Sequence, residues 1–518
     1  MLAGLLFGLS LIVHAQRPAY KTIGGTVVNA LNGDPVRAAH LALTLQSDGS
    51  PVATTESDEN GHFELHVTAA AKYQLRASHA GYTTVFYEQH GDFSSAIVAG
   101  PDEQTSQLLF RLPPMASLHG TVLGEGGDAV AGASVLLYRA NRDRLSPQKL
   151  LHAGTAATDD LGFYEFDDLE PGEYRVAVLA QPWYAMHSTR EGSNPALDVA
   201  YPATYYDAAT DEAAALPLRL EPGSREQADF SLHAVAALRL NLSQPHEAGS
   251  AGATLTPLLF GMPAPDASLI SNDTASASSF SGIAPGRYQM AASNRLLDLE
   301  AAASGPVDLQ NGAPAADLSG TAETASGQKI EEDALVELDP AEAGNQPLTA
   351  LLHNGSFQLS AVPAGLWNVR LRNGYGYEVP LTGLLQDGKP RPGLQLATRG
   401  KPVQLQITAQ PATASVSGFV RHNGKGFAGA MVILVPAGLQ GFPALARRDQ
   451  SDSDGSFELR NVLPGRYVVL ALADAWTLDW TDPATIRRFL PDGESVTLTG
   501  SQRETLRLSS PVELQTRE

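Results

Sequence analysis

The chain has 518 residues, with 35 Lys and Arg against 56 Asp and Glu, so its formal net charge is −21, and it contains no cysteine. This acidic balance disfavours nucleic acid and anionic membranes as partners, because both are polyanions. The lack of cysteine excludes disulfides, cysteine-bound zinc, iron–sulfur clusters and thiol nucleophiles. Length alone predicts roughly three or four domains, and the 48 glycines and 34 prolines indicate many turns between short strands.

The first 15 residues predict a signal peptide. They form an uncharged apolar run that ends in the small-residue site Val13-His14-Ala15, so cleavage is expected after Ala15. No Lys or Arg precedes the run, which departs from the usual basic start of such segments. No later stretch approaches the roughly 20 apolar residues that span a bilayer. We therefore expect a secreted, periplasmic or cell-surface protein without a transmembrane segment in the mature chain.

An internal repeat of about 100 residues organises the rest of the chain. Four similar strands open with glycine in an apolar alternation. They are Ile23-Gly-Gly-Thr-Val-Val28, Leu118-His-Gly-Thr-Val122, Leu318-Ser-Gly-Thr-Ala322 and Val416-Ser-Gly-Phe-Val420. The interval between the second and third of these strands is twice the others, which leaves room for a degenerate copy that begins near Ala237. The sequence therefore predicts five modules.

Two turn signals recur within the modules. The first combines Asp or Asn with Gly and then an aromatic residue: Asp58-Glu-Asn-Gly-His-Phe63, Asp159-Asp-Leu-Gly-Phe-Tyr164, Asn354-Gly-Ser-Phe357 and Asp452-Ser-Asp-Gly-Ser-Phe457. The second, Pro-Gly or a variant before an aromatic residue, precedes Tyr174, Tyr288, Trp367 and Tyr467. We expect this second signal to close a hairpin through a type II turn with positive φ at glycine. The first module has Lys72-Tyr73 without Pro-Gly, so its turn should differ.

These elements predict an all-β fold: a tandem array of about five Ig-like or prealbumin-like antiparallel β-sandwich modules, with about six to seven strands in each. The predicted boundaries are 1–15 for the signal peptide, then 16–114, 115–234, 235–316 (the degenerate copy), 317–410 and 411–518.

The combination of Ser-Gly-x-Val, Asp-x-x-Gly-x-Phe and Leu-Pro-Gly-x-Tyr resembles the carboxypeptidase regulatory-like domain family. Its fold is similar to the transthyretin-like, or prealbumin-like, sandwich and is grouped with carbohydrate-binding-like folds. The match is best in residues 21–87, 117–179 and 415–473. The resemblance implies accessory, non-catalytic units, and tandem copies without an enzyme are similar to large secreted bacterial proteins.

Catalytic motifs are missing from the sequence. None of the 13 histidines is followed by Glu three positions later, and no His-Glu-x-x-His, Gly-x-Ser-x-Gly or phosphate-loop pattern is present. We expect no enzyme activity, no cofactor and no metal site. Asp452 and Asp454 are weak calcium candidates, because carboxylates on a tight loop suit hard cations; the alternative is a plain Asx turn.

Aromatic residues in the second module are the candidate glycan contacts: Trp183, Tyr184, Tyr201, Tyr205 and Tyr206. Such rings can stack on a pyranose, or they can cap the sandwich and bury against the next module. Trp476 and Trp480 in the fifth module form a smaller second candidate.

The preferred function is a non-catalytic, secreted rod or chain of modules that acts as an extracellular scaffold or adhesion protein. One alternative is a carbohydrate-binding protein that uses the exposed aromatics of module two. Another is an accessory or regulatory partner of a secreted enzyme or outer-membrane receptor. The candidate partners are a polysaccharide or another extracellular protein.

Overall fold

The computed structural model describes residues 21–100, 105–141, 149–187, 194–242, 253–273, 278–292, 295–330, 334–341, 347–373, 379–410, 414–439, 442–443, 445–499 and 505–516. The predicted signal peptide lies outside the described residues. Nearly every regular element is a β-strand, which confirms the all-β prediction. The short helices are η1 (Pro195–Leu197), η2 (Glu212–Ala214), η3 (Leu309–Asn311), η4 (Pro392–Leu394), η5 (Ala437–Leu439), α1 (Pro483–Arg487) and η6 (Leu490–Asp492).

Five units follow one another along the described chain, each with two main sheets around its own hydrophobic core, and the second unit has a further two-stranded sheet. The first unit contains β1 (Lys21–Asn29), β2 (His40–Leu45), β3 (Pro51–Glu56), β4 (His62–Val67), β5 (Lys72–His79), β6 (Tyr82–Phe86), β7 (Ile97–Val98) and β8 (Leu108–Leu112). The second contains β9 (Ala116–Leu123), β10 (Ser134–Ala140), β11 (Leu150–Ala157), β12 (Phe163–Leu169), β13 (Gly172–Leu179), β14 (Val199–Ala200), β15 (Thr204–Tyr205), β16 (Leu218–Leu220), β17 (Arg225–Gln227), β18 (Phe230–Ser231) and β19 (Val235–Ala236).

The remaining three units repeat this plan. The third contains β20 (Leu238–Leu242), β21 (Thr254–Leu259), β22 (Met262–Pro263), β23 (Leu269–Ile270), β24 (Asn272–Asp273), β25 (Ser278–Ile283), β26 (Gly286–Ala292), β27 (Arg295–Ala301) and β28 (Gly305–Val307). The fourth contains β29 (Ala313–Thr324), β30 (Leu335–Pro340), β31 (Leu348–Leu351), β32 (Ser356–Pro363), β33 (Gly365–Arg372), β34 (Leu381–Gln386), β35 (Lys389–Pro390), β36 (Gln395–Thr398) and β37 (Val403–Ala409). The fifth contains β38 (Ala414–His422), β39 (Lys425–Gly426), β40 (Met431–Pro436), β41 (Arg447–Gln450), β42 (Ser456–Val462), β43 (Gly465–Leu472), β44 (Glu494–Leu498), β45 (Thr505–Arg507) and β46 (Val512–Glu513).

The opening strand of each unit lies between an antiparallel strand and a parallel closing strand. In the first unit β1 pairs with β4 in the antiparallel sense and with β8 in the parallel sense. The pairs of β9, β20, β29 and β38 follow the same rule. Every unit of the predicted antiparallel sandwich therefore contains at least one parallel pair, and the second and fifth units contain two.

Close approach of the closing strand explains the glycine of the opening strand. A Cβ atom placed on Gly25 would lie 1.9 Å from the Leu108 carbonyl oxygen, and one on Gly120 would lie 1.9 Å from the Ala228 carbonyl oxygen. Only glycine leaves room for a backbone at this distance. The glycine is therefore a packing requirement of the parallel pair in the first two units, whereas at Gly320 and Gly418 a Cβ would first meet the rings of Phe357 and Phe457.

The two turn signals have different outcomes. The Asx-Gly glycines have positive φ, with values of 75° at Gly61 and 74° at Gly162. The hairpin prediction for Pro-Gly is wrong, because β12 pairs with β9 whereas β13 pairs with β10 in the other sheet. Gly172 does not have positive φ, so the type II turn is also wrong there. The Pro-Gly segment carries the chain from one sheet to the other.

The aromatic residue after this crossing anchors it. Its polar atom donates a hydrogen bond to the carbonyl oxygen four residues earlier. The pairs are Tyr73 to Ala69 (3.0 Å), Tyr174 to Glu170 (2.7 Å), Tyr288 to Ala284 (2.9 Å), Trp367 to Pro363 (3.2 Å) and Tyr467 to Leu463 (2.9 Å). The first unit makes this bond without Pro-Gly, so the aromatic residue, rather than the proline, is the constant part of the corner.

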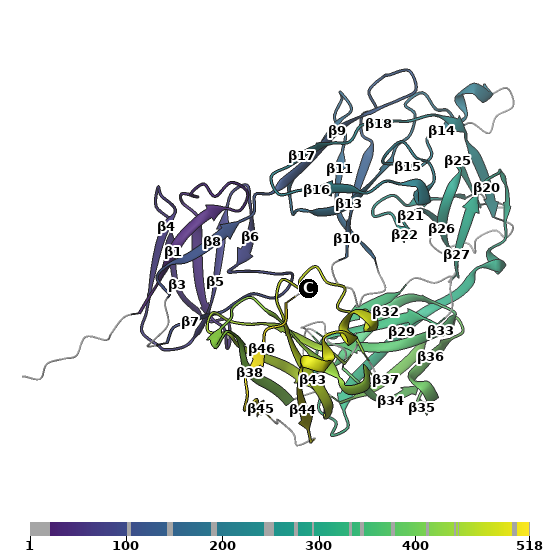
Figure 1. The fold of residues 1–518 in the computed structure, drawn as a ribbon. Helices are drawn as coiled ribbons and strands as arrows, with labels where there is room; N and C mark the ends of the chain where they lie inside the picture. The colour runs from purple at the N-terminus through teal and green to yellow at the C-terminus, as the bar shows by residue number, and fades with distance from the viewer. Residues whose placement is uncertain are drawn as a thin grey trace, which may run out of the picture.

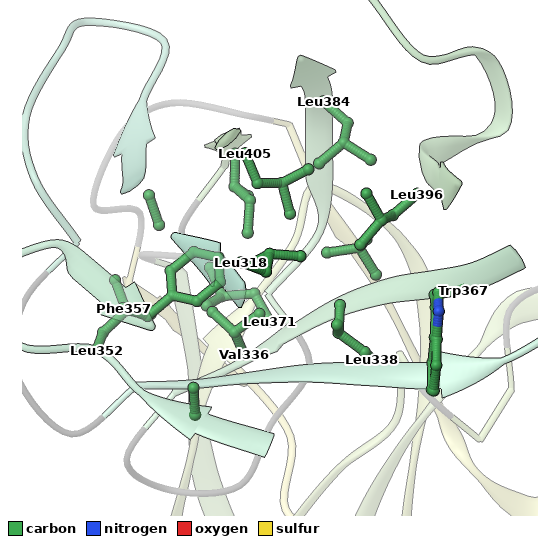
Figure 2. Packing of buried hydrophobic residues seen from close by; sticks show 14 of the residues in the cluster. Leu318, Val336, Leu338, Leu352, Phe357, Trp367, Leu371, Leu384, Leu396 and Leu405 are labelled. Atoms are coloured by element: carbon green, nitrogen blue, oxygen red, sulfur yellow. The ribbon is translucent and has the colours of Figure 1, made fainter. Parts of the chain in front are cut away.

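Hydrophobic side chains from both sheets fill each unit, as Figure 2 shows for the fourth. Leu318, Phe357 and Leu405 come from the sheet of β29, and Val336 and Leu371 come from the facing sheet. Full burial of one such side chain stabilises the fold by about 1.5–3 kcal/mol. The period-two alternation of the strands therefore places the core correctly.

Neighbouring units are joined in several ways. Strand β27 pairs with β29, so the third and fourth units share one continuous sheet. The predicted boundary between 316 and 317 falls inside β29. Between the second and third units, Tyr138 and Tyr205 pack edge-on against Phe260, with ring centroids 5.2 and 5.0 Å apart. The other predicted boundaries stay predictions.

The five units, expected from the sequence to form a rod or chain, follow a closed circuit. Figure 1 shows the purple first unit beside the yellow-green fifth unit, at the two ends of the described chain. Hydrogen bonds join these units between residues 355 to 380 positions apart. This contact, called the clasp below, consists of residues 72 and 88–98 of the first unit and residues 448–453 and 476 of the fifth.

Candidate functional site: the clasp between the first and fifth units

The backbone of the clasp joins the turn between β41 and β42 to the extended segment that ends in β7. The Ser453 N–H donates to the Ala96 carbonyl oxygen at 2.9 Å, and the Val98 N–H donates to Ser453 Oγ at 2.8 Å. Ser95 Oγ donates to the Ser451 carbonyl oxygen at 2.9 Å. The fifth unit therefore holds a strand segment of the first much as an edge strand holds a peptide.

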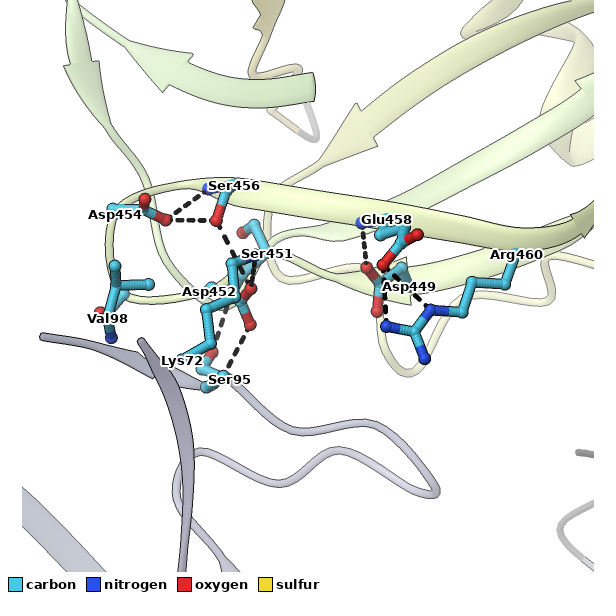
Figure 3. A network of polar contacts seen from close by, with 12 residues as sticks. Lys72, Ser95, Val98, Asp449, Ser451, Asp452, Asp454, Ser456, Glu458 and Arg460 are labelled. Atoms are coloured by element: carbon cyan, nitrogen blue, oxygen red, sulfur yellow. Dashed lines mark hydrogen bonds and ion pairs between the residues drawn. The ribbon is translucent and has the colours of Figure 1, made fainter. Parts of the chain in front are cut away.

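Asp452 lies at the centre of the clasp, where Figure 3 shows its carboxylate facing the first unit. Lys72 Nζ is 2.6 Å from Asp452 Oδ2, and the Ala96 N–H donates to Asp452 Oδ1 at 2.8 Å. Asp452 is only 2% exposed. Burial raises the pKa of the Asp452 carboxyl, and the Lys72 ammonium acts in the opposite direction.

The equivalent aspartates of the first two units serve their own turns. Asp58 Oδ1 accepts the N–H groups of Asn60 and His62, both at 2.8 Å. These local bonds, with that of His62 first, lower the pKa of the exposed Asp58. In the fifth unit Asp454 takes over this local task, because its Oδ1 accepts the Ser456 N–H at 2.8 Å. A second aspartate in the turn therefore frees Asp452 for the contact with the first unit.

Gln450 forms the second polar centre of the clasp and is 1% exposed. Its Nε2 donates to the Glu88 carbonyl oxygen at 2.6 Å and to Ser95 Oγ at 2.9 Å. Its Oε1 lies 3.0 Å from His90 Nδ1, which donates when that nitrogen carries the proton. Both the nitrogen and the oxygen of the Gln450 amide therefore contact polar groups of the first unit.

Aromatic rings close one side of the clasp. His90 stacks on Trp476 with centroids 5.0 Å apart and planes 8° apart, and Trp476 Nε1 donates to the Gly429 carbonyl oxygen at 3.0 Å. The Arg448 guanidinium lies 4.9 Å from the Phe93 ring centroid and 4.2 Å from that of Trp480. Of the two tryptophans considered as glycan contacts, Trp476 therefore packs across the interface, and Trp480 contacts Arg448 within the fifth unit.

A polar groove runs beside the clasp and is lined by both units, including Lys72, Asp92, Arg448 and Asp449. The Glu458 N–H donates to Asp449 Oδ2 at 2.7 Å, and Arg460 forms an ion pair with Glu458 at 2.8 Å (Figure 3). Burial raises the pKa of Asp449 to about 7, and the nearby Asp452 charge adds to this effect. Asp449 is thus the groove residue whose charge changes near neutral pH.

The calcium candidates do not form a ligand set. The Lys72 ammonium and the Ala96 amide occupy the Asp452 oxygens, and Asp454 bonds to its own turn. Over the described residues, no cluster of three or more His, Asp or Glu side chains has the arrangement of a metal site. A cation at Asp452 would have to displace Lys72.

The five glycan candidates of the second module are divided by the structure. Trp183 is 86% exposed, and the half-buried Tyr184 donates its hydroxyl to Glu125 Oε1 at 2.6 Å, a bond that raises the Tyr184 pKa to about 12. Tyr201 and Tyr205 are 7% and 4% exposed, and Tyr206 packs against Phe230 in the core. Of the five candidates, Trp183 therefore has the most exposed side chain.

Comparison with known proteins identifies the class of the first unit: residues 22–111 match the family model of the carboxypeptidase regulatory-like domain. This unit is therefore similar to that family, which is the one that the motifs resemble. No curated protein matches the chain. Within the described residues, no helix has the length and apolar character needed to cross a membrane.

Several solved structures share parts of the β-architecture at low similarity. The Bacillus anthracis TIE protein is 12% identical over 76% of this chain and 75% of its own, with a TM-score of 0.19. A shaft pilin SpaA from Lactobacillus rhamnosus GG is 9% identical over 42% and 97%, with a TM-score of 0.22. The minor pilin of Streptococcus agalactiae is 13% identical over 41% and 96%, with a TM-score of 0.20. Scores this low carry no argument about function.

Proposed function

We propose that the chain is a non-catalytic scaffold protein, exported to the cell surface or beyond, whose five sandwich units are closed into a circuit by the clasp. The clasp itself carries this proposal. Its buried groups, above all Asp452 and Gln450, are bonded across two units at opposite ends of the chain. Buried polar groups that satisfy one another fix a single arrangement. A fixed arrangement of sandwiches is what a scaffold requires.

Two measurements test this proposal. Small-angle scattering of residues 16–518 should give the compact dimensions of a closed circuit, and an Asp452→Ala variant should be more extended. Fractionation of producing cells should place the protein in the medium or at the surface. Retention of the chain in the cytoplasm, or the same extended profile for both proteins, would contradict the proposal.

Carbohydrate contact is the second candidate function, and the exposed Trp183 ring favours it. Aromatic faces that remain in solvent can stack on sugars, and Tyr184 is held beside Trp183 at a centroid distance of 5.8 Å. The test is retention of the mature protein on insoluble cellulose, chitin and peptidoglycan. Trp183→Ala should abolish retention, whereas Leu161→Ala, which removes another exposed apolar side chain of the second unit, should not. Equal retention of both variants would eliminate this function.

A further inference from the structure

The two halves of the clasp are different surfaces. The first unit contributes Lys72 and the strand segment 95–98, and the fifth contributes the turn from Gln450 to Ser453. Such a contact is heterologous: neither surface can pair with itself, but each can pair with the other surface of a second copy. The same bonds can therefore close one molecule or join two.

The first unit can swing away when the clasp opens. The described backbone hydrogen bonds near the junction of the first two units all involve residues 113–115, where the chain passes from one unit to the other. They are Thr83 N–H to Pro113 O (2.8 Å), Met115 N–H to Gly81 O (2.9 Å) and Gly223 N–H to Pro114 O (3.1 Å). No hydrophobic cluster of the described residues spans these two units. Within the described residues, opening of the clasp would therefore leave the first unit held to the second by this connection and the bonds beside it.

We propose that the clasp exchanges between molecules, so that the fifth unit of one copy holds the first unit of the next and head-to-tail assemblies form. This inference rests on the proposed function, because the closed circuit is the state that opens. It names the partner of the clasp as a second copy of the same chain.

The exchange breaks and re-forms the same set of contacts, and this determines its free energy. Each bond lost inside one molecule is regained between two, so the balance depends on the effective concentration of the first unit within its own chain. The clasp is also mainly polar, and the Lys72 side chain remains 36% exposed. Polar contacts between domains are typical of interfaces that open and re-form. High local protein concentration should therefore favour assembly.

Single cysteines provide the test, because the chain has none of its own. Ser453 Oγ lies 2.8 Å from the Val98 amide nitrogen, so Val98→Cys and Ser453→Cys introduce one thiol on each side of the clasp at adjoining positions. The two single variants are mixed at high concentration, opened in mild urea, returned to buffer and oxidised. The expected product is a covalent dimer with one Val98→Cys and one Ser453→Cys chain. Adding Asp452→Ala to the second chain should reduce its yield several-fold.

The controls separate this inference from the closed circuit itself. A chain with both substitutions should cross-link internally and remain a monomer when it is dilute; failure of this step would overturn the closed circuit. Mixing Val98→Cys with Asp160→Cys, at an exposed turn of the second unit, gives the background of random collision. If the double variant cross-links but the mixed singles give no more dimer than this background, exchange is refuted and the closed circuit stands.

Discussion

Lys72 and Asp452 are 380 positions apart in the chain, yet Lys72 Nζ lies 2.6 Å from Asp452 Oδ2. The carboxylate is almost fully buried, whereas the ammonium remains in partial contact with water. A buried carboxylate without a partner is costly, so each unit depends on the other for this pair. The ion pair thus makes the two ends of the molecule one structural element.

Lys72→Met should open the clasp more often, because it leaves the Asp452 carboxylate without its ammonium partner. Loss of a hydrogen bond to a charged group in a partly exposed pair costs about 1–3 kcal/mol. Hydrogen exchange of the Ser453 and Ala96 amides, both of which donate across the clasp, measures how often the clasp opens. Their exchange should rise by about 5- to 150-fold. Lys389→Met, at an exposed position of β35, is the matched control, and equal exchange in both variants would contradict the role of the pair.

The clasp region should lose stability as the pH rises from about 4 to about 7. The folded-state pKa of Asp449 is raised to about 7 from an ordinary 3.8, and that of Asp452 is raised as well. A raised carboxyl pKa means that the folded form binds the proton more tightly. Its stabilising contribution is therefore complete below the ordinary pKa and is lost as the pH passes the folded-state value.

The test of this pH dependence is Asp449→Asn, which keeps the shape of the protonated acid but cannot ionise. Urea unfolding of the variant at pH 5 and pH 8 should show a smaller difference in midpoint than the parent chain. Asp160→Asn, in an exposed turn, should keep the parent difference. An unchanged pH response in Asp449→Asn would assign the effect to other groups of the groove.

The fold could be predicted from the sequence because its determinants are local. Alternation along the strands marks the core, and Asp58 or Asp159 with the following glycine marks the turns. Hairpins were predicted at Pro-Gly because two adjacent strands usually pair. The crossing between sheets depends instead on the hydrogen bond from the Tyr174 hydroxyl to the Glu170 carbonyl oxygen. The sequence pattern does not predict this hydrogen bond.

The clasp could not be predicted, because no feature of one segment identifies its partner in a distant segment. Ser95, Lys72 and Gln450 belong to no motif, and their partners lie more than 350 positions away. One signal was present: the turn of the fifth unit carries both Asp452 and Asp454, whereas one aspartate is enough to cap it. The turn of the second unit also carries a second aspartate, the exposed Asp160 beside the capping Asp159, so the surplus alone does not identify an inter-unit contact.

Gly120→Ala should destabilise the second unit strongly. Its added methyl carbon would overlap the Ala228 carbonyl oxygen at 1.9 Å, so β9 and the closing strand would have to separate. Overpacking of this kind costs about 1–3 kcal/mol. Gly305→Ala makes the same chemical change in β28, where no atom lies within 4 Å of the new Cβ, and thermal unfolding should separate the two variants. Similar unfolding temperatures would show that the opening glycine is not required for the parallel pair.

The aromatic residues of the second unit should separate into a structural and a surface group. Tyr205 is 4% exposed and packs on Phe260 of the third unit, so Tyr205→Ala should lower the free energy of unfolding by about 3–5 kcal/mol, the range for large aromatic truncations. Trp183→Ala removes a ring that is 86% exposed, so the change should stay within about 0.5 kcal/mol. Urea unfolding of both variants measures these two changes in the free energy of unfolding. A large loss for Trp183→Ala would mean that its ring is a packing element, and its retention data on polysaccharides would then report folding rather than sugar contact.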